Sequence, residues 1–188
     1  MALYRREKTG MGDYVDASMY DTLLSWTAHL TGPVLADGVA PTTREGRSIG
    51  GAAFYNVYET EDGRFIALTG REPKFATSLL TILGRMDLFD LCCLDDCVAQ
   101  EPVKEALREA FKSKTQAEWI DMLEPLELAW APVLDMVEAF EQEHAIARDM
   151  IVTDPAGLRH VGNPIKFREE PAELRFDVPE LEQPSKIG

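Results

Sequence analysis

This sequence of 188 residues lacks the long apolar stretches that mark membrane and secreted proteins. No run approaches the roughly 20 apolar residues that a helix needs to cross a bilayer. The opening residues, MALYRREKTG, carry charges but have no apolar stretch behind them, unlike a secretory signal. We therefore expect a cytoplasmic protein that has no membrane partner.

Positive charge is also scarce. The chain has 19 lysines and arginines against 33 aspartates and glutamates, which gives a net charge of −14. So much negative charge repels phosphate groups, and we expect no nucleic-acid partner. A hydrophobic content of 45% and a charged content of 28% are typical of a folded globular protein rather than a disordered one.

Metal-binding and phosphate-binding motifs are missing as well. The three cysteines, Cys92, Cys93 and Cys97, have no cysteine or histidine partner at the spacing of a zinc site. The sequence contains neither a glycine-rich phosphate loop nor the G-x-S-x-G turn of serine hydrolases. We therefore predict no metal site and interpret the cysteines as thiols at a buried or half-buried helix end.

The most informative segment that is present runs from Gly50 to Phe75. Aromatic and β-branched residues at 54–58 and an apolar run at 65–68 flank the turn residues Glu61-Asp62-Gly63, which predicts a β-hairpin. Glu72-Pro73 then opens an apolar-periodic segment. The pair is typical of a helix N-cap and first helical residue, because proline lacks the N–H that the first turn leaves unpaired.

The position of Glu72 admits two roles. As an N-cap, its carboxylate complements the helix dipole. As a side chain on a tight strand-to-helix corner, it is also held where a rigid scaffold can aim it at a substrate. The local pattern alone leaves both roles open.

The remaining patterns predict an α+β protein without internal repeats. Before the hairpin we expect a short strand at 14–16, an apolar helix over about 18–30 and a linker at 32–51. After the hairpin, the spacing predicts four helices: at 73–84, at 87–93, from near Pro102, and from the capping box of Thr115. We then expect a strand or extended run at 128–133, a helix at 134–148, and strands at 150–153 and 162–167.

These elements suggest three parts. Residues 1–49 form a helical arm and linker, residues 50–167 form a small α+β domain with a β-hairpin or small sheet and several helices, and residues 168–188 form an extended C-terminal arm. The helix at 18–30 is apolar on most sides, and nothing in the next stretch of sequence covers it.

Several spaced motifs resemble class III CoA-transferases, the family that includes alpha-methylacyl-CoA racemase, formyl-CoA transferase and carnitine CoA-transferase. The segment RREKTGMGDYVDASMYD at 5–21 is similar to a family motif, and the likeness extends over nearly the whole chain. The segments that resemble the racemase-like branch are 50–55, 58–64 and the corner 72–75. Further similarities lie at Trp119, 131–133, 138–139 and 147–150.

The resemblance implies that a large N-terminal α/β domain, which binds coenzyme A in the family, should precede Ala2. We therefore expect this chain to be a truncated gene product, an engineered fragment or one subunit of a split enzyme, and to be inactive alone. It implies no cofactor bound by this chain alone. A coenzyme A thioester is the substrate of the intact enzyme, and the chain meets this acyl-CoA through the missing domain.

The resemblance also implies a role for Glu72. Racemases of the family remove and return the proton on the acyl α-carbon through a thioester enolate, and Glu72 matches one of their two acid/base groups. Phe54, Tyr55, Pro73 and Phe75 then contribute to the acyl site, although core packing explains Phe54, Tyr55 and Phe75 equally well.

Two alternatives remain at this stage. The chain is similar enough to the transferase branch to be a fragment that moves CoA between carboxylic acids, with Glu72 only positioning the substrate. Alternatively, it is a non-catalytic interaction module. Members of the family form interlocked dimers, and an uncovered apolar helix favours self-association, so we expect a homo-oligomer.

Overall fold

The predicted hairpin lies at the centre of the fold. In the computed structural model, which describes residues 1–176 apart from the side chains of residues 47 and 48, β1 (Tyr55–Glu59) pairs antiparallel with β2 (Phe65–Thr69). The register places Tyr55 opposite Thr69 at the open end of the hairpin. Strand β3 (Trp130–Val133) joins β2 to complete a three-stranded sheet in the order β1-β2-β3. The predicted α+β class is therefore confirmed.

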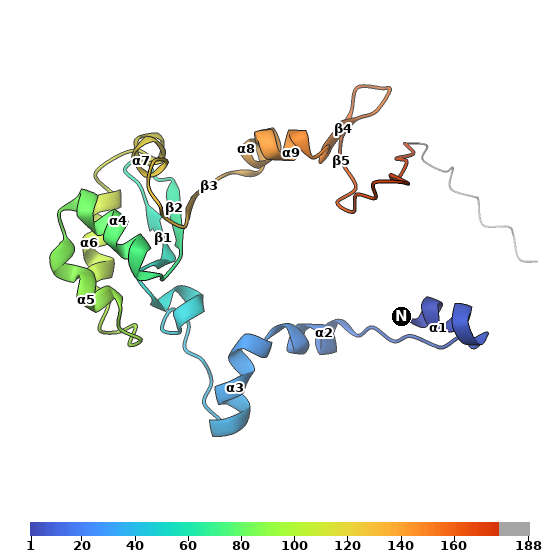
Figure 1. Cartoon of the computed structure of the whole chain (residues 1–188), viewed down its shortest axis with the longest axis horizontal. Helices are drawn as coiled ribbons and strands as arrows, with labels where there is room; N and C mark the ends of the chain where they lie inside the picture. The colour runs from blue at the N-terminus through green and yellow to red at the C-terminus, as the bar shows by residue number, and fades with distance from the viewer. Residues whose placement is uncertain (177–188) are drawn as a thin grey trace, which may run out of the picture. The chain divides into compact units, whose positions relative to one another are not determined.

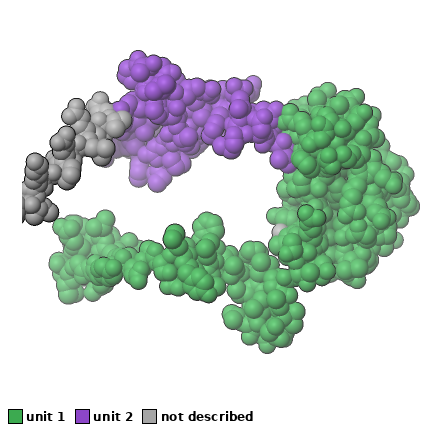
Figure 2. Space-filling view, turned by 180° about the vertical axis from the view of Figure 1, so that it is seen from behind, with its two compact units in different colours: residues 1–132 green, residues 133–188 purple. Residues whose placement is uncertain are grey.

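The chain divides into two compact units, residues 1–132 and residues 133–188, which Figure 2 colours separately. The predicted boundaries of a first arm at 1–49, a small domain at 50–167 and a second arm at 168–188 stay a prediction. Residues 177–188 of the second arm lie outside the described residues.

Three of the four helices expected after the hairpin in the first unit begin where the sequence predicts, whereas the single helix expected at 87–93 is divided into a 3₁₀ turn and a short α-helix. Proline lies in the first turn of the helices that begin near Glu72 and near Gln100, and the capping box at Thr115 is formed in full. Gly84 ends its helix with a φ of 65°, a left-handed conformation that glycine adopts without strain. These elements are α4 (Pro73–Leu83), a 3₁₀ turn (Met86–Leu88), α5 (Phe89–Cys92), α6 (Glu101–Phe111) and α7 (Gln116–Leu123).

Helices α4, α5 and α6 lie beside the hairpin (Figure 1), and an aromatic cluster fills the space between sheet and helices. The Phe111 ring stacks on Tyr58 at 5.2 Å and meets Trp119 at 4.7 Å, and all three side chains are buried. The Trp119 indole N–H donates to the Phe111 carbonyl at 2.9 Å. The buried Tyr58 hydroxyl donates to the Ala53 carbonyl at 2.7 Å, and burial raises the pKa of Tyr58 well above its usual value.

The hairpin turn is fastened to the start of α7. The Asp62 carboxylate accepts hydrogen bonds from the Thr60 hydroxyl at 2.5 Å and from the Gln116 backbone N–H at 3.3 Å. In return, the Gln116 side-chain amide donates to the Phe65 carbonyl at 2.7 Å. The hydrogen bonds that the Asp62 carboxylate accepts, above all the one from the Thr60 hydroxyl, hold the pKa of Asp62 below its ordinary value.

The segment before the hairpin differs from its prediction in three places. Residues 14–16 form no strand, and the helix expected at 18–30 is broken at Thr27 into α2 (Met19–Trp26) and α3 (Ala28–Asp37). Because α3 accommodates Pro33, it runs into the predicted linker. None of α1 (Ala2–Thr9), α2 or α3 has a buried residue. A short irregular helical turn at Arg47–Gly51 leads into the sheet.

The described part of the second unit contains two short helices followed by a hairpin. The single helix expected at 134–148 is interrupted at Gln142, whose backbone is extended, so it becomes α8 (Met136–Glu141) and α9 (Glu143–Ala147). Strand β4 (Ile151–Thr153) pairs with β5 (Arg159–Val161) rather than with the predicted strand at 162–167. The reason is local: the Asp154 carboxylate accepts from the Ala156 and Leu158 N–H groups, which closes the turn early.

Among residues 1–176, no helix combines the length and the apolar character needed to cross a membrane.

The aromatic cluster should dominate the stability of the first unit. We expect Phe111→Ala to lower the free energy of unfolding by about 3–5 kcal/mol, because it removes the ring that separates Tyr58 from Trp119. Urea denaturation followed by circular dichroism measures this. Phe167→Ala, at a side chain that is 64% exposed, should change stability by less than about 0.5 kcal/mol. Equal losses in the two variants would contradict the assignment.

Removal of the turn carboxylate should produce a pH-dependent loss of stability. The folded pKa of Asp62 lies below its ordinary value of 3.8, so ionised Asp62 stabilises the fold above that pH and its contribution disappears as the pH falls through the folded pKa. We expect Asp62→Ala to lower the urea midpoint at neutral pH and to approach the wild type as the pH falls through the folded pKa of Asp62. Glu61→Ala, on the same turn, is the matched control. A pH-independent difference would refute this account.

Candidate active-site corner at Glu72

The corner that joins β2 to α4 is tight because Gly70 has no side chain. A Cβ added to Gly70 would lie 2.7 Å from the Ala129 Cβ and closer still to the Phe75 ring. The Thr69 N–H also donates to the Ala129 carbonyl at 2.9 Å, which fixes the end of β2 against the segment before β3. The close approach therefore requires glycine and leaves the chain that follows little freedom.

Glu72 occupies the N-cap of α4, as predicted, with an extended backbone at φ −62° and ψ 137°. The Phe75 N–H donates to the Glu72 carbonyl at 2.9 Å and closes the first turn. Within the described structure, however, the Glu72 side chain makes no hydrogen bond to that turn. Its carboxylate still benefits from the positive end of the helix dipole, but it is exposed and not committed to capping.

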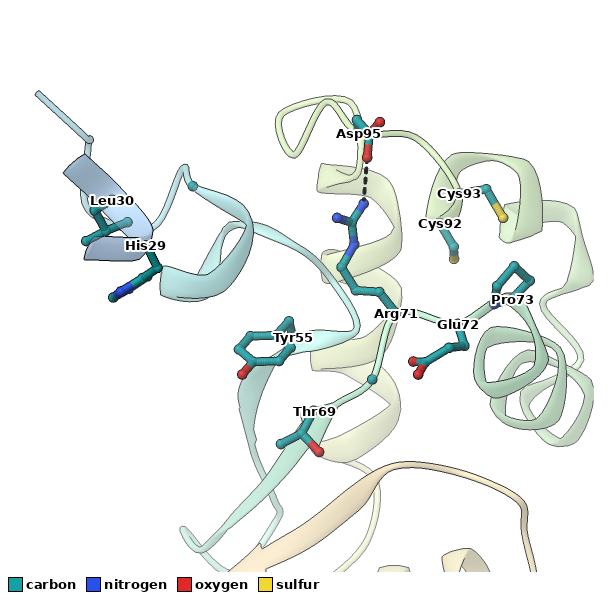
Figure 3. A pocket seen from close by; sticks show the side chains of 12 residues that line it. His29, Leu30, Tyr55, Thr69, Arg71, Glu72, Pro73, Cys92, Cys93 and Asp95 are labelled. Carbon is teal, nitrogen blue, oxygen red and sulfur yellow. Dashed lines mark hydrogen bonds and ion pairs between the residues drawn. The ribbon is translucent and has the colours of Figure 1, made fainter. Parts of the chain in front are cut away.

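A hollow of about 940 Å³ opens beside this corner. In Figure 3 the Glu72 carboxylate lies on the side of the corner that carries Thr69 and Tyr55, the two residues that face each other at the open end of the hairpin. The residues that line the hollow are His29, Leu30, Gly46, Tyr55, Thr69, Gly70, Arg71, Glu72, Pro73, Cys92, Cys93 and Asp95.

Arg71 connects the corner to the segment after α5. Its side chain is only 14% exposed, and its guanidinium donates to the Leu94 carbonyl at 3.0 Å and to the Asp95 carboxylate at 3.5 Å. The Asp95 side chain is fully exposed, so water screens that ion pair and the bond to the Leu94 carbonyl is the more effective contact.

The structure gathers some of the predicted site residues at the hollow but not all of them. Tyr55, Glu72 and Pro73 line it, whereas Phe54 is only 3% exposed and lies in the hydrophobic core. Phe75 is half-buried and packs beneath Gly70 rather than on the lining. Their assignment to catalysis and to the acyl site stays a prediction.

Sequence reasoning missed the lining residues that come from elsewhere in the chain. Cys92, Cys93 and Asp95 follow Glu72 by some 20 residues, and only the fold of α4 and α5 brings them to the same hollow. Arg71 could have been noticed, since it adjoins Glu72, but its bond to the Leu94 carbonyl has no signature in the sequence.

Of the two cysteines that line the hollow, Cys92 is chemically inert because of its environment. Cys92 is buried, whereas the neighbouring Cys93 is exposed. Desolvation raises the pKa of Cys92 to about 12, which keeps its thiol protonated at neutral pH. Among residues 1–176, no group of three or more histidine, cysteine, aspartate or glutamate side chains is arranged to hold a metal ion.

Comparison with known proteins places this chain in a family. The sequence matches CoA-transferase family III over residues 1–185. Acetyl-CoA:oxalate CoA-transferase from Acetobacter aceti is 29% identical over 188 residues, which cover 97% of this chain and 47% of that protein. Alpha-methylacyl-CoA racemase from Mus musculus is 32% identical over 158 residues, which cover 82% of this chain and 40% of the racemase.

The fold comparison agrees. A crystal structure of a CAIB/BAIF family protein from Brucella suis superposes with a TM-score of 0.71 at 24% identity, over 95% of this chain and 48% of that chain. The chain thus spans less than half the length of these relatives. Both a transferase and a racemase match, so the comparisons support the family without separating its two activities. Because the match covers residues 1–185, the chain belongs to CoA-transferase family III.

Proposed function

We propose that this chain forms the small-domain portion of an acyl-CoA-processing enzyme in which Glu72 carries a proton to and from the acyl α-carbon. The observation behind the proposal is the position of the Glu72 carboxylate. It is exposed at a hollow, on a corner that glycine packing makes rigid, and it makes no bond to the helix that it precedes.

The chemistry explains why a carboxylate held in this way is useful. A thioester makes the adjacent α-proton acidic enough for a well-placed base to remove it, and the resulting enolate takes a proton back on either face. Inversion needs a second proton carrier on the opposite face, because one carboxylate cannot reach both. The rigid corner supplies orientation, which is a large part of such a rate enhancement.

The second carrier and the coenzyme A site belong, in this proposal, to the part of the fold that the chain does not span. The relatives are more than twice as long as the matched region, which leaves room for both. The chain alone is then inactive, and Tyr55 and Pro73 form the part of the acyl site that it contributes.

Transfer of CoA between carboxylic acids is the second candidate. The Acetobacter aceti relative, whose name states that activity, matches 97% of this chain, against 82% for the mouse racemase. In this case Glu72 positions the substrate and takes no proton.

The role of Glu72 can be tested in a fusion of this chain with the part of the mouse racemase that lies outside the match. We expect the fusion to exchange the α-proton of a branched acyl-CoA in deuterated water. Glu72→Gln should lower that exchange by about 10²–10⁴-fold, because the amide cannot accept the proton, while thioester binding survives. Glu105→Gln, at an exposed position of α6, is the matched control. Retained exchange in Glu72→Gln would exclude the role.

The two candidate activities differ in their products. The racemase-like reaction predicts deuterium at the α-carbon without any new thioester, when the fusion is incubated with an acyl-CoA and a second carboxylic acid. The transferase reaction predicts the second acid as its CoA ester with the α-proton retained. Mass spectrometry of both thioesters separates the outcomes, and transfer without exchange would reverse our order of preference.

A further inference from the structure

The segment that forms one wall of the hollow has little regular structure of its own. After α5 ends at Cys92, residues 93–98 are exposed except for Cys97. The Cys93 and Leu94 N–H groups make only long backbone hydrogen bonds of 3.3 Å, to Asp90 and Leu91. Side chains from other elements must therefore hold this wall in place.

Two such side chains meet at one atom, the carbonyl oxygen of Leu94. The Gln100 side-chain amide donates to it at 2.6 Å, and the Arg71 guanidinium donates to it at 3.0 Å. A carbonyl oxygen has two lone pairs, so these donors satisfy it completely. Leu94 is thus held from within the protein by Gln100 and from the corner by Arg71.

The inner support is firmly fixed. Gln100 is only 1% exposed, and its side-chain oxygen accepts the Ala53 N–H at 2.8 Å, just before β1 begins. The base of the hairpin, the wall and the corner are consequently linked in a row: Ala53, Gln100, the Leu94 carbonyl and Arg71.

The outer support lies directly beside the proposed proton carrier. Arg71 immediately precedes Glu72, and in Figure 3 their side chains leave the corner in different directions, the guanidinium toward Asp95 and the carboxylate toward Thr69. A hydrogen bond from a guanidinium is charge-assisted, and the Arg71 side chain that donates this one is only 14% exposed, although Leu94 lies at the surface. This bond is therefore stronger than the exposed pair with Asp95.

We propose that Arg71 is a positioning residue, which fixes the Glu72 corner against the wall at Cys93 and Leu94 through its hydrogen bond to the Leu94 carbonyl. The inference rests on the proposed function, because the distance between corner and wall matters only if Glu72 acts on a substrate bound between them. It assigns Arg71 no contact with the reacting atoms.

Loss of this bond should loosen the wall without unfolding the unit. The Gly70 corner keeps its packing against Phe75, and Gln100 keeps its hold on Leu94 from within. The corner and the wall then move independently, so the carboxylate meets the substrate in the correct geometry for a smaller fraction of the time.

Hydrogen exchange on the 188-residue chain tests the link directly. We expect Arg71→Met to speed exchange at the Cys93 and Leu94 amides by about tenfold, with the melting temperature unchanged. Arg71→Lys keeps a cationic donor at the position and should restore at least half of the lost protection. Arg85→Met is the matched control, since Arg85 also pairs with a nearby aspartate, Asp87, but is remote from Leu94 in its contacts. Unchanged hydrogen exchange at the Cys93 and Leu94 amides of Arg71→Met would overturn the proposal.

Kinetics in the fusion test the consequence. Arg71→Met should lower kcat for α-proton exchange by about tenfold or more and leave KM within about twofold, and Arg71→Lys should recover most of the loss. A rise in KM with kcat unchanged would mean that Arg71 binds the substrate, which would overturn its role in positioning.

The two proposals fail separately. If Glu72→Gln retains exchange of the substrate α-proton, the proposed function is wrong, whatever amide hydrogen exchange shows at Cys93 and Leu94. If Glu72→Gln abolishes exchange while Arg71→Met keeps the wild-type kcat, the function stands and the role of Arg71 is wrong.

Discussion

The absence of a side chain at Gly70 is the constraint on which the site depends. Phe75 and Ala129 occupy the space that any Cβ would need, so only glycine fits where the chain turns from β2 into α4. That turn places Glu72 at the N-cap and Pro73 in the first helical turn. A carboxylate on a flexible loop would have to be ordered with each substrate, whereas the backbone that carries this one is already held by packing in the fold.

Polar side chains, rather than additional strands, join the pieces around this corner. Gln116 and Asp62 fasten the hairpin turn to α7, and Gln100 fastens the hairpin base to the segment after α5. Gln100 and Gln116 are nearly fully buried, so the loss of either partner in such a pair leaves an unpaired polar group inside the protein. A short sheet can thus support a precise site, because its register and its neighbours are specified by these bonds.

Whether a feature of the fold or of the site can be predicted from the sequence depends on how far apart along the chain its interacting residues lie. The hairpin, the Glu72-Pro73 start of α4 and the capping box at Thr115 depend on residues within a few positions of one another, and the sequence alone predicts them. The return strand after Asp154 was placed too late, because the hydrogen bonds of an aspartate side chain closed the turn early. The contact of Arg71 with Leu94 joins residues 23 positions apart, and no local pattern signals it.

The linker predicted before the hairpin shows that local patterns can also mislead. Glycine and proline at 32–33 suggested a linker, yet α3 continues through Pro33 to Asp37. Proline removes a single hydrogen bond from a helix, and a helix with no buried residue has little packing to lose by bending there. The preference of Gly32 and Pro33 for a linker therefore did not end the helix. Large apolar side chains of α2 are exposed, Trp26 among them at 78%. Under the proposed function, burial of these side chains by the part of the fold that this chain does not span would add to stability.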